Sequence, residues 1–383
     1  MRIAYCANVR LPSERAHGHQ IAQVCDALAA LGHDVTILAP KRWNPVQEEY
    51  HAYYKANPKV HLQYLRAFDP NMHGMSTGLP GLLFANYTTG CAIRCTLQKQ
   101  QFDLLYTRAP ALLGKLLQTG VPVVLELHQI PRFGHRRFVA HCNRCRIVAC
   151  LTSPMRDALI AMGVEPERII VEGDAVDLSR FTKLPSQVVA QKQFGVRTKR
   201  TVVGYVGRLK TLGMEKGVSH LLQALSVLRP EATHFGLIVG GPDGDCAEYQ
   251  AQAKSLGLTE EDVCFTGAVS AHDVPASLAA CDILAMPFPD FPHYRNHMSP
   301  LKMFEYMAAE RVIITSDLPT VRDVLSEETA VFCEPDNVAS LVGALQFIAA
   351  NPDDAKKRTA AARSLVEHHT WQERMKRILK AAI

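Results

Sequence analysis

Short runs of consecutive apolar residues recur along the chain, and segments with helical hydrophobic periodicity lie between them. The first run covers residues 3–6, and a helical pattern follows from about Gln20 to Leu31. A turn at Gly32 then leads into a second apolar run at 35–38. A strand, a helix and a second strand in this order form the unit from which parallel sheets are built.

Two series of such units follow one another. The first continues through strand candidates at 104–106, 121–127, 147–151 and 168–171. The second begins near residue 201, with strand candidates at 202–206, 235–239, 263–266, 283–286, 312–315 and 330–332. Residues 43–83 mix Pro, Gly, Tyr and His without a clear period, and we expect long loops there. The pattern predicts an α/β protein with two tandem doubly wound, Rossmann-like parallel-sheet domains.

The predicted domain boundary lies where the chain is polar, basic and without a strand of its own. We place an N-terminal domain at 1–181, a linker at 182–200 and a C-terminal domain at 201–368. Ligands of doubly wound sheets bind at the carboxyl ends of the strands, so we expect the functional site in a cleft between the two domains.

The composition is that of a globular protein. A chain of 383 residues that is 48% apolar can form two cores, and no run reaches the roughly 18 apolar residues of a membrane span. The N-terminus lacks the apolar stretch of a signal peptide, which predicts a cytoplasmic protein. Eleven cysteines, an odd number scattered among strands and helices, fit reduced thiols better than a disulfide framework.

Two cysteine pairs have spacings that a metal site could use. Cys91 and Cys95, together with Cys142 and Cys145, could hold a structural zinc ion. The same spacings place each pair on one face of a helix, where free cysteine packs as a small apolar side chain. We prefer the second interpretation and predict no metal site, because such spacings also arise without a metal.

The net charge of +5 is concentrated in the first half of the chain. It is densest around Arg132, Arg136 and Arg137, in a stretch from 127 to 156 that contains no acidic residue. Such a stretch is either a solvated helix face or a surface that meets anionic lipid, at the inner membrane face, or a phosphate-bearing acceptor. Nucleic acid is the weaker alternative, since no aromatic stacking pattern accompanies the arginines.

Two cations follow the first strand of the second domain. Gly207 and Arg208 end that strand, and Lys216 comes shortly before the next helical pattern. Arginine offers a planar fork that suits phosphate, and lysine offers a mobile point charge. Either residue alone would be read as an exposed cation on a loop, but their place at the carboxyl end of a strand favours an anion site.

A helix start at 299–308 adds a second anion-binding feature. Ser299 is a good N-cap and Pro300 suits the first helical turn. The backbone N–H groups of Leu301 and Lys302 would then lack helical partners and favour an anion. Glu305, further along the helix, could accept hydrogen bonds from sugar hydroxyls or be solvated.

Two glycines and one histidine lie where the predicted strands end. Gly241 gives a bare backbone that a ligand could approach, and Gly18, in the loop after the first strand, could admit a diphosphate or a sugar. His128 ends the strand candidate at 121–127, where it is either a structural residue or one that steers a reacting sugar.

Taken together, these segments resemble the retaining glycosyltransferases of family 4, which have the GT-B architecture, over nearly the whole chain. The resemblance implies that Arg208 and Lys216 hold the donor pyrophosphate and that Glu305, the second glutamate of an E-x7-E motif, contacts the ribose. It implies further that the backbone around Val269 meets the base and that His128 lies beside the anomeric carbon.

The ends of the two domains carry the same resemblance. Gly18 corresponds to the family's N-terminal glycine loop, and residues 174–181 are similar to its N/D-G-V-D-x-x-x-F stretch. The last helix, at 369–383, looks like the one that crosses back onto the first domain. One departure stands out, because the first glutamate of E-x7-E falls at His297.

We therefore expect metal-independent transfer of a hexosyl unit from a UDP- or GDP-sugar, with retention, to a glycan or lipid-linked acceptor. The alternatives are a nucleotide-sugar epimerase of the same fold and a non-catalytic nucleotide-sugar-binding protein, the latter motivated by His297. An oxidoreductase is a poor fit, since neither domain shows G-x-G-x-x-G after its first strand.

Overall fold

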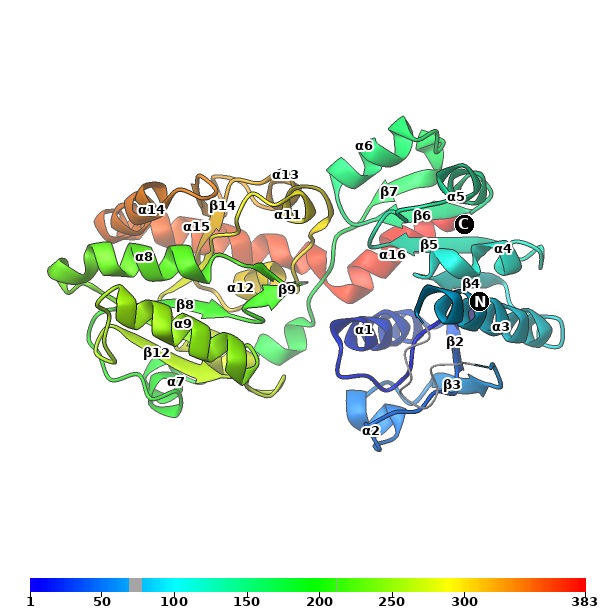
Figure 1. The fold of residues 1–383 in the computed structure, drawn as a ribbon, viewed down its shortest axis with the longest axis horizontal. Helices are drawn as coiled ribbons and strands as arrows, with labels where there is room; N and C mark the ends of the chain where they lie inside the picture. The colour runs from blue at the N-terminus through cyan, green and yellow to red at the C-terminus, as the bar shows by residue number, and fades with distance from the viewer. Residues whose placement is uncertain (69–77, 212) are drawn as a thin grey trace. The chain divides into compact units, whose positions relative to one another are not determined.

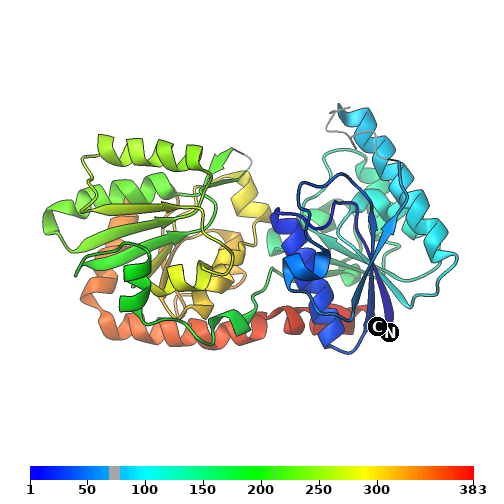
Figure 2. The same ribbon diagram turned by 90° about the horizontal axis from the view of Figure 1, so that it is seen from below.

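The computed structural model describes residues 1–68, 78–211 and 213–383 (Figures 1 and 2). The chain forms two compact units, Met1–Gly173 with Trp371–Ile383, and Asp174–Thr370. Each unit contains a parallel sheet covered by helices, which confirms the predicted fold class.

The sheet of the first unit has the order β3-β2-β1-β4-β5-β6-β7 among the described residues, and all neighbouring strands are parallel. Its strands are β1 (Arg2–Cys6), β2 (Asp34–Pro40), β3 (Val60–Leu65), β4 (Leu104–Thr107), β5 (Val123–Leu127), β6 (Ile147–Cys150) and β7 (Ile169–Val171). Its helices are α1 (Ala16–Ala30), α2 (Tyr50–Tyr54), α3 (Gly78–Leu97), α4 (Leu113–Leu116), α5 (His135–Cys142), α6 (Ser153–Ala161) and α16 (Trp371–Ala382). The strand order reverses between β1 and β4, so this edge is the expected ligand position of the unit.

The second unit has the order β12-β11-β8-β13-β14-β15, again parallel, with its reversal between β8 and β13. Its strands are β8 (Thr201–Val206), β11 (His234–Val239), β12 (Val263–Gly267), β13 (Ile283–Met286), β14 (Val312–Ser316) and β15 (Val331–Cys333), with a small hairpin of β9 (Lys210–Thr211) and β10 (Met214–Glu215). Its helices are α7 (Gln187–Gln193), α8 (Val218–Leu228), α9 (Asp243–Ser255), α10 (Val274–Ala279), α11 (Pro292–His297), α12 (Leu301–Ala308), α13 (Pro319–Arg322), α14 (Val338–Ala350) and α15 (Pro352–Val366).

Strand burial explains the continuous apolar runs in the sequence. Along β8, Val202 and Val206 enter the core on one face of the sheet, while Val203 and Tyr205 enter the core on the other face. A strand buried on both faces needs apolar residues at every position, as parallel sheets generally do.

The structure differs from the predicted organisation in three places. The stretch at 43–83 contains α2, β3 and the start of α3 where long loops were expected, although 69–77 lie outside the described residues. The predicted linker at 182–200 contains α7, and Ala190 of this helix is buried in the second core. The first unit ends at Gly173, so the predicted boundary at 181 falls inside the second unit.

The cysteines of the two pairs lie in different surroundings. Cys142 and Cys145 are buried in the core of the first unit, whereas Cys91 and Cys95 lie on α3. Burial raises the pKa of the Cys145 thiol to about 12, which keeps it protonated. Among the described residues, no helix combines the length and hydropathy of a membrane span.

Candidate functional site

Cations gather at the carboxyl end of β8 in the second unit. Arg208 is exposed, and its carbonyl accepts a hydrogen bond from the Tyr205 hydroxyl at 2.8 Å. Lys216 follows the β9–β10 hairpin and is partly buried. Its burial, and then the charge of Arg208, lowers the pKa of Lys216 to about 8. The structure thus brings Arg208 and Lys216 together at the strand reversal where ligands of such sheets bind.

Lys302 adds a third cation to this group. Its side chain is buried, its Nζ has no hydrogen-bond partner among the described residues, and Nζ lies 3.5 Å from the centroid of the Tyr205 ring. Burial, and then the nearby Lys216, holds the pKa of Lys302 well below its usual range. The ammonium group also lies beside Gly207, where a side chain in place of hydrogen would meet Nζ at 3.3 Å. A buried, unpaired cation of this kind needs an anion to be stabilised.

The prediction that Ser299 caps the helix is wrong in its details. Helix α12 begins at Leu301 with Pro300 in the cap position, and no side chain caps it. The Ser299 hydroxyl instead accepts a hydrogen bond from the backbone N–H of Asp174 at 2.8 Å. The N–H groups of Leu301 and Lys302 still lie in the first turn of α12, where the helix itself supplies no acceptor.

Glu305 faces a cation from the stretch that precedes the second sheet. The Arg180 guanidinium lies 3.4 Å from its Oε1, and both residues belong to the second unit. Burial raises the pKa of Glu305, and the charge of Arg180 opposes that rise. Residues 174–181 therefore contact α12 through Arg180 and the residue just before its cap through Asp174, which places this stretch beside the candidate donor site.

The glycines at the strand ends serve contacts between neighbouring loops. A side chain at Gly240 would meet the Gly207 carbonyl oxygen at 2.0 Å, and one at Gly241 would meet the Leu209 side chain at 2.7 Å. The N–H of Gly240 also donates to the carbonyl of Gly267, at the end of β12. These loops approach so closely because no side chain separates them, and Val269, next along the chain, packs half-buried against the core.

A histidine, His297, occupies the position where the family motif has its first glutamate. His297 ends α11, and its Nδ1 is buried without a partner among the described residues. The ring of His293, on the same helix, lies 6.3 Å from that of His297. Burial lowers the pKa of both imidazoles, and the charge of Lys216 also lowers that of His293. Neutral histidines therefore line this part of the cation group.

In the first unit, His128 is part of a hydrogen-bonded network at the end of β5. Its Nε2 lies 2.6 Å from Oε1 of Glu126 and 3.0 Å from Nε2 of Gln20. Glu126 is fully buried, which opposes its ionisation, but the charges of Arg374 and His128 outweigh this and hold the pKa of Glu126 well below its usual range. Arg374 reaches Glu126 from α16 with an N–O distance of 2.9 Å.

This network contains residues that the sequence did not single out. Gln20 accepts a hydrogen bond from Arg108, and Tyr106 donates one to Glu126. Only their positions in the sequence could have indicated a role. Arg108 directly follows β4 and Gln20 lies in the helix after β1, and these two strands flank the strand reversal. The His128 side chain is about one fifth exposed. The hydrogen bonds of the network therefore fix an imidazole that stays partly accessible to solvent.

Gly18 does not lie in a loop, as predicted, but in the first turn of α1, which begins at Ala16. A side chain at Gly18 would meet the Tyr54 hydroxyl at 2.3 Å, so this glycine makes room for a neighbour within the unit. Arg132, Arg136 and Arg137, by contrast, are exposed, at and before the start of α5.

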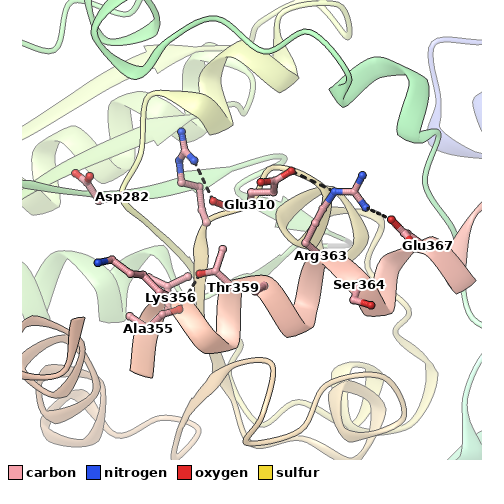
Figure 3. Close-up of a pocket in the computed structure, with 11 residues that line it drawn as sticks. Asp282, Glu310, Ala355, Lys356, Thr359, Arg363, Ser364 and Glu367 are labelled. Atoms are coloured by element: carbon pink, nitrogen blue, oxygen red, sulfur yellow. Dashed lines mark hydrogen bonds and ion pairs between the residues drawn. The ribbon is translucent and has the colours of Figure 1, made fainter. Parts of the chain in front are cut away.

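The pocket shown in Figure 3 lies at the opposite end of the second sheet. It has a volume of about 640 Å³ and is lined by residues that precede β13 and β14, such as Asp282 and Arg311, and by one side of α15. Arg363 lies between Glu310 and Glu367 at 3.3 and 3.2 Å, so its charges are already paired. Arg311 donates to the carbonyls of Cys281 and Ala279, so both arginines of this pocket already have partners, unlike the buried Lys302 ammonium near the carboxyl end of β8.

Comparison with known proteins agrees with this geometry. The family model for glycosyltransferase family 4 matches residues 18–180, and that for glycosyl transferases group 1 matches residues 200–351. A 2-deoxystreptamine glucosyltransferase from Streptomyces kanamyceticus is 28% identical over 58% of this chain and 63% of its own, so the match spans less than two thirds of that relative. A GDP-mannose-dependent alpha-mannosyltransferase from Corynebacterium glutamicum is 24% identical over 75% of this chain and 67% of its own.

Solved structures show the same fold. HepE from Anabaena, in complex with UDP, superimposes with a TM-score of 0.76 at 18% identity over 99% of each chain. A glycosyltransferase from Rickettsia africae gives the same TM-score at 15% identity, over 100% of this chain and 97% of its own. The two family matches together span both units, and the chain belongs to the family 4 glycosyltransferases of GT-B architecture.

Proposed function

We propose that the protein is a retaining glycosyltransferase that transfers a hexosyl unit from a UDP- or GDP-sugar to a glycan or lipid-linked acceptor. The observation that carries this proposal is the gathering of Arg208, Lys216 and Lys302 at the carboxyl end of β8, beside the first turn of α12. A nucleoside diphosphate is the ligand whose charge matches such a group.

In the proposed reaction, the bond between the anomeric carbon and the donor diphosphate breaks, and a bond to an acceptor hydroxyl forms on the same face of the sugar. The hydroxyl proton passes to an oxygen of the departing diphosphate. Negative charge grows on the diphosphate as the bond breaks, and Arg208, Lys216 and the N–H groups of α12 stabilise it. These cations would neutralise the diphosphate without a metal ion, and His128 would lie beside the sugar.

Named relatives support both nucleotide alternatives. HepE has been solved with UDP-glucose, at 18% identity to this chain, and the Corynebacterium relative is named for GDP-mannose. The histidines at 293 and 297 make the sugar end of the site unlike one built around a glutamate. We therefore leave the donor to be identified by binding, with UDP-glucose, UDP-N-acetylglucosamine and GDP-mannose as the first panel.

The test compares two arginines at opposite ends of β8. Arg208→Ala removes a cation from the candidate site, whereas Arg197→Ala removes an exposed cation that precedes the strand. We expect Arg208→Ala to weaken nucleotide-sugar binding and to slow release of nucleoside diphosphate by about a hundredfold or more, and Arg197→Ala to leave both unchanged.

Calorimetry measures the donor affinity, and the anomeric configuration of the product is read by NMR. Equal donor affinity and activity in the two variants would contradict the assignment of Arg208 to the donor site. An inverted product would contradict retention alone.

A further inference from the structure

The first half of α3 exposes its large apolar side chains and buries its small ones. The buried positions are Gly81, Ala85 and Thr89. The exposed positions, each at least half exposed, are Leu79, Leu82, Leu83, Phe84 and Tyr87. A surface helix normally shows the opposite arrangement, with its large apolar residues toward the core. This half of α3 therefore presents an apolar surface that the described residues of the unit do not cover.

Aromatic side chains outside the helix extend this surface. The Phe68 ring packs edge-on against Phe84 with centroids 5.8 Å apart, and the Thr88 hydroxyl donates to the Phe68 carbonyl at 2.5 Å. A pocket of about 590 Å³ next to Phe68 is lined by Trp43 and by the ends of β2 and β3. We call the exposed residues of α3, with Trp43 and Phe68, the apolar face. Figure 2 shows α3 along the outside of the first unit.

Cations lie on two sides of the apolar face. Lys41 and Arg66 are exposed and line the pocket beside Trp43 and Phe68, and no carboxylate is among the described residues that line it. On the other side, the Lys115 ammonium lies 4.6 Å from the centroid of the Tyr87 ring. No residue of α3 is acidic. The exposed Arg137 continues this charge, since its guanidinium lies against Gly114, next to Lys115.

We propose that the apolar face and the cations around it dock the first unit onto an anionic lipid bilayer. A bilayer surface offers acyl chains for leucine and phenylalanine, an interfacial layer that suits Trp43 and Tyr87, and headgroup phosphates for the cations. A protein partner would not require cations on both sides of the apolar centre. This docking goes beyond the proposed transfer reaction, and it would bring a lipid-linked acceptor within reach of the first unit.

The experiment measures binding of the full chain to vesicles by flotation. Phosphatidylcholine vesicles test apolar insertion alone, and vesicles that also contain phosphatidylglycerol test the charge. We expect binding to the anionic vesicles that falls as salt is added, because ions screen the attraction between the cations and the headgroups.

The decisive variant is the double substitution Leu83→Glu with Phe84→Glu. It should lower binding to anionic vesicles at least about tenfold, since two inserted side chains are lost and two negative charges are added. The matched control is Val188→Glu with Val189→Glu, two adjacent exposed apolar residues on α7 of the second unit, which should bind like the wild type. All four side chains are exposed, so the variants should keep the wild-type melting temperature.

A second pair of variants tests the cations. Lys41→Gln with Arg66→Gln should lower binding about fivefold for each charge removed and should flatten the salt dependence. Lys254→Gln with Lys356→Gln, two exposed lysines of the second unit, should change neither.

Three outcomes would overturn the proposal. The wild type could remain unbound to both kinds of vesicle, or the Leu83 and Phe84 variant could bind as well as its control. The wild type could also run as a dimer that the same variant converts to a monomer, in which case the face meets a second copy of the chain. None of these outcomes depends on transferase activity, so this proposal and the proposed function can fail separately.

Discussion

Lys302 is the residue at which stability and function are most directly opposed. An ammonium group without a hydrogen-bond partner is costly to bury, and its contact with the Tyr205 ring offsets only part of that cost. We expect Lys302→Met to raise the free energy of unfolding of the free protein by about 1–3 kcal/mol, because methionine has a similar volume and no charge. The same variant should gain less stability from added donor than the wild type does.

The pH dependence of the free energy of unfolding provides a second test of the buried charge. Because the pKa of Lys302 is lowered in the folded state, the unfolded chain binds more protons between the folded and unfolded pKa values. Wild-type stability should therefore rise with pH through that window, and Lys302→Met should lose part of the rise. Urea unfolding across a pH series measures this, with the exposed Lys254→Met as the control. A variant less stable than the wild type at every pH would contradict our account of the buried charge.

Sequence reasoning could place residues whose position follows from the local pattern, and it missed contacts that depend on distant neighbours. Arg208 and Lys216 follow a predictable strand end, so their place at the sheet edge could be predicted. The roles of Ser299 and Lys302 could not, because one contacts Asp174 and the other contacts Tyr205, both far away in the sequence. For the same reason, nothing in the sequence around His128 indicates that Arg374 stabilises the carboxylate beside it.

At the scale of elements, the candidate donor site lies where two neighbouring strands stop pairing. In the described residues, β8 pairs with β13 only at Val203 and Gly204, so the end of β8 has no strand on that side. The hydroxyl of Tyr306, from α12, takes the place of the missing strand. It accepts from the Val206 N–H at 2.8 Å and donates to the Val206 carbonyl at 3.1 Å. One side chain thus joins the helix that carries Lys302 to the end of the strand that Arg208 follows.

We expect Tyr306→Phe to lower the free energy of unfolding by about 1–3 kcal/mol, since it leaves a buried N–H and a buried carbonyl unsatisfied. It should also weaken donor binding, because the first turn of α12 is no longer fixed to the end of β8. Denaturant unfolding and calorimetry measure the two effects. Tyr64→Phe, which removes a single hydrogen bond from a partly exposed tyrosine to Leu11, should change stability by less than about 1 kcal/mol. Donor binding equal to that of the wild type would contradict the fixing role of Tyr306.

Whether an element could be predicted depended on which side its apolar residues face. The central strands of both sheets are buried on both faces, and their apolar runs matched the observed elements within a few residues. The partly exposed β3 has no such run and lies in the stretch where loops were expected. Helix α3 escaped prediction because its first half exposes leucine and phenylalanine and buries glycine and alanine, which obscures a helical stripe. Helix α7 was not predicted because it buries little apolar surface, with Ala190 as its buried residue, and so it shows no apolar stripe.

At the scale of the whole chain, the first unit is completed only by the last residues. Helix α16 packs against α1 and supplies Arg374, which is fully buried and donates to Glu126 and to the carbonyl of Gly173. The chain must therefore pass through the entire second unit before the first can close its core. Contacts this distant in sequence form late and slowly, because a long loop has to be closed first.

Removing the Arg374 side chain should destabilise the first unit far more than the second. Arg374→Ala leaves the Glu126 carboxylate buried without its cation, which typically costs about 3–5 kcal/mol. Arg377→Ala, three residues further along the same helix, breaks an ion pair with Glu172 that is partly exposed, and should cost about 1 kcal/mol or less. Peptide-resolved hydrogen exchange measures this, and amide exchange in Arg374→Ala should become faster in β5 and α16 than in the second unit.

The pH dependence separates a lost charge pair from lost packing. In the wild type, the lowered pKa of Glu126 contributes stability that is present above the usual glutamate pKa of about 4.3 and is lost as the pH falls through the folded value. Without Arg374, Glu126 loses the strongest of the charges that lower its pKa, and burial is opposed only by His128 and Arg108. The pKa of Glu126 should therefore rise, so the variant carries a penalty that grows with pH. The stability difference between wild type and Arg374→Ala should therefore be largest near neutral pH and shrink toward about pH 4. A difference that stays constant across this range would mean that Arg374 stabilises the unit by its contacts with Trp371 and Gly173 and not by its charge.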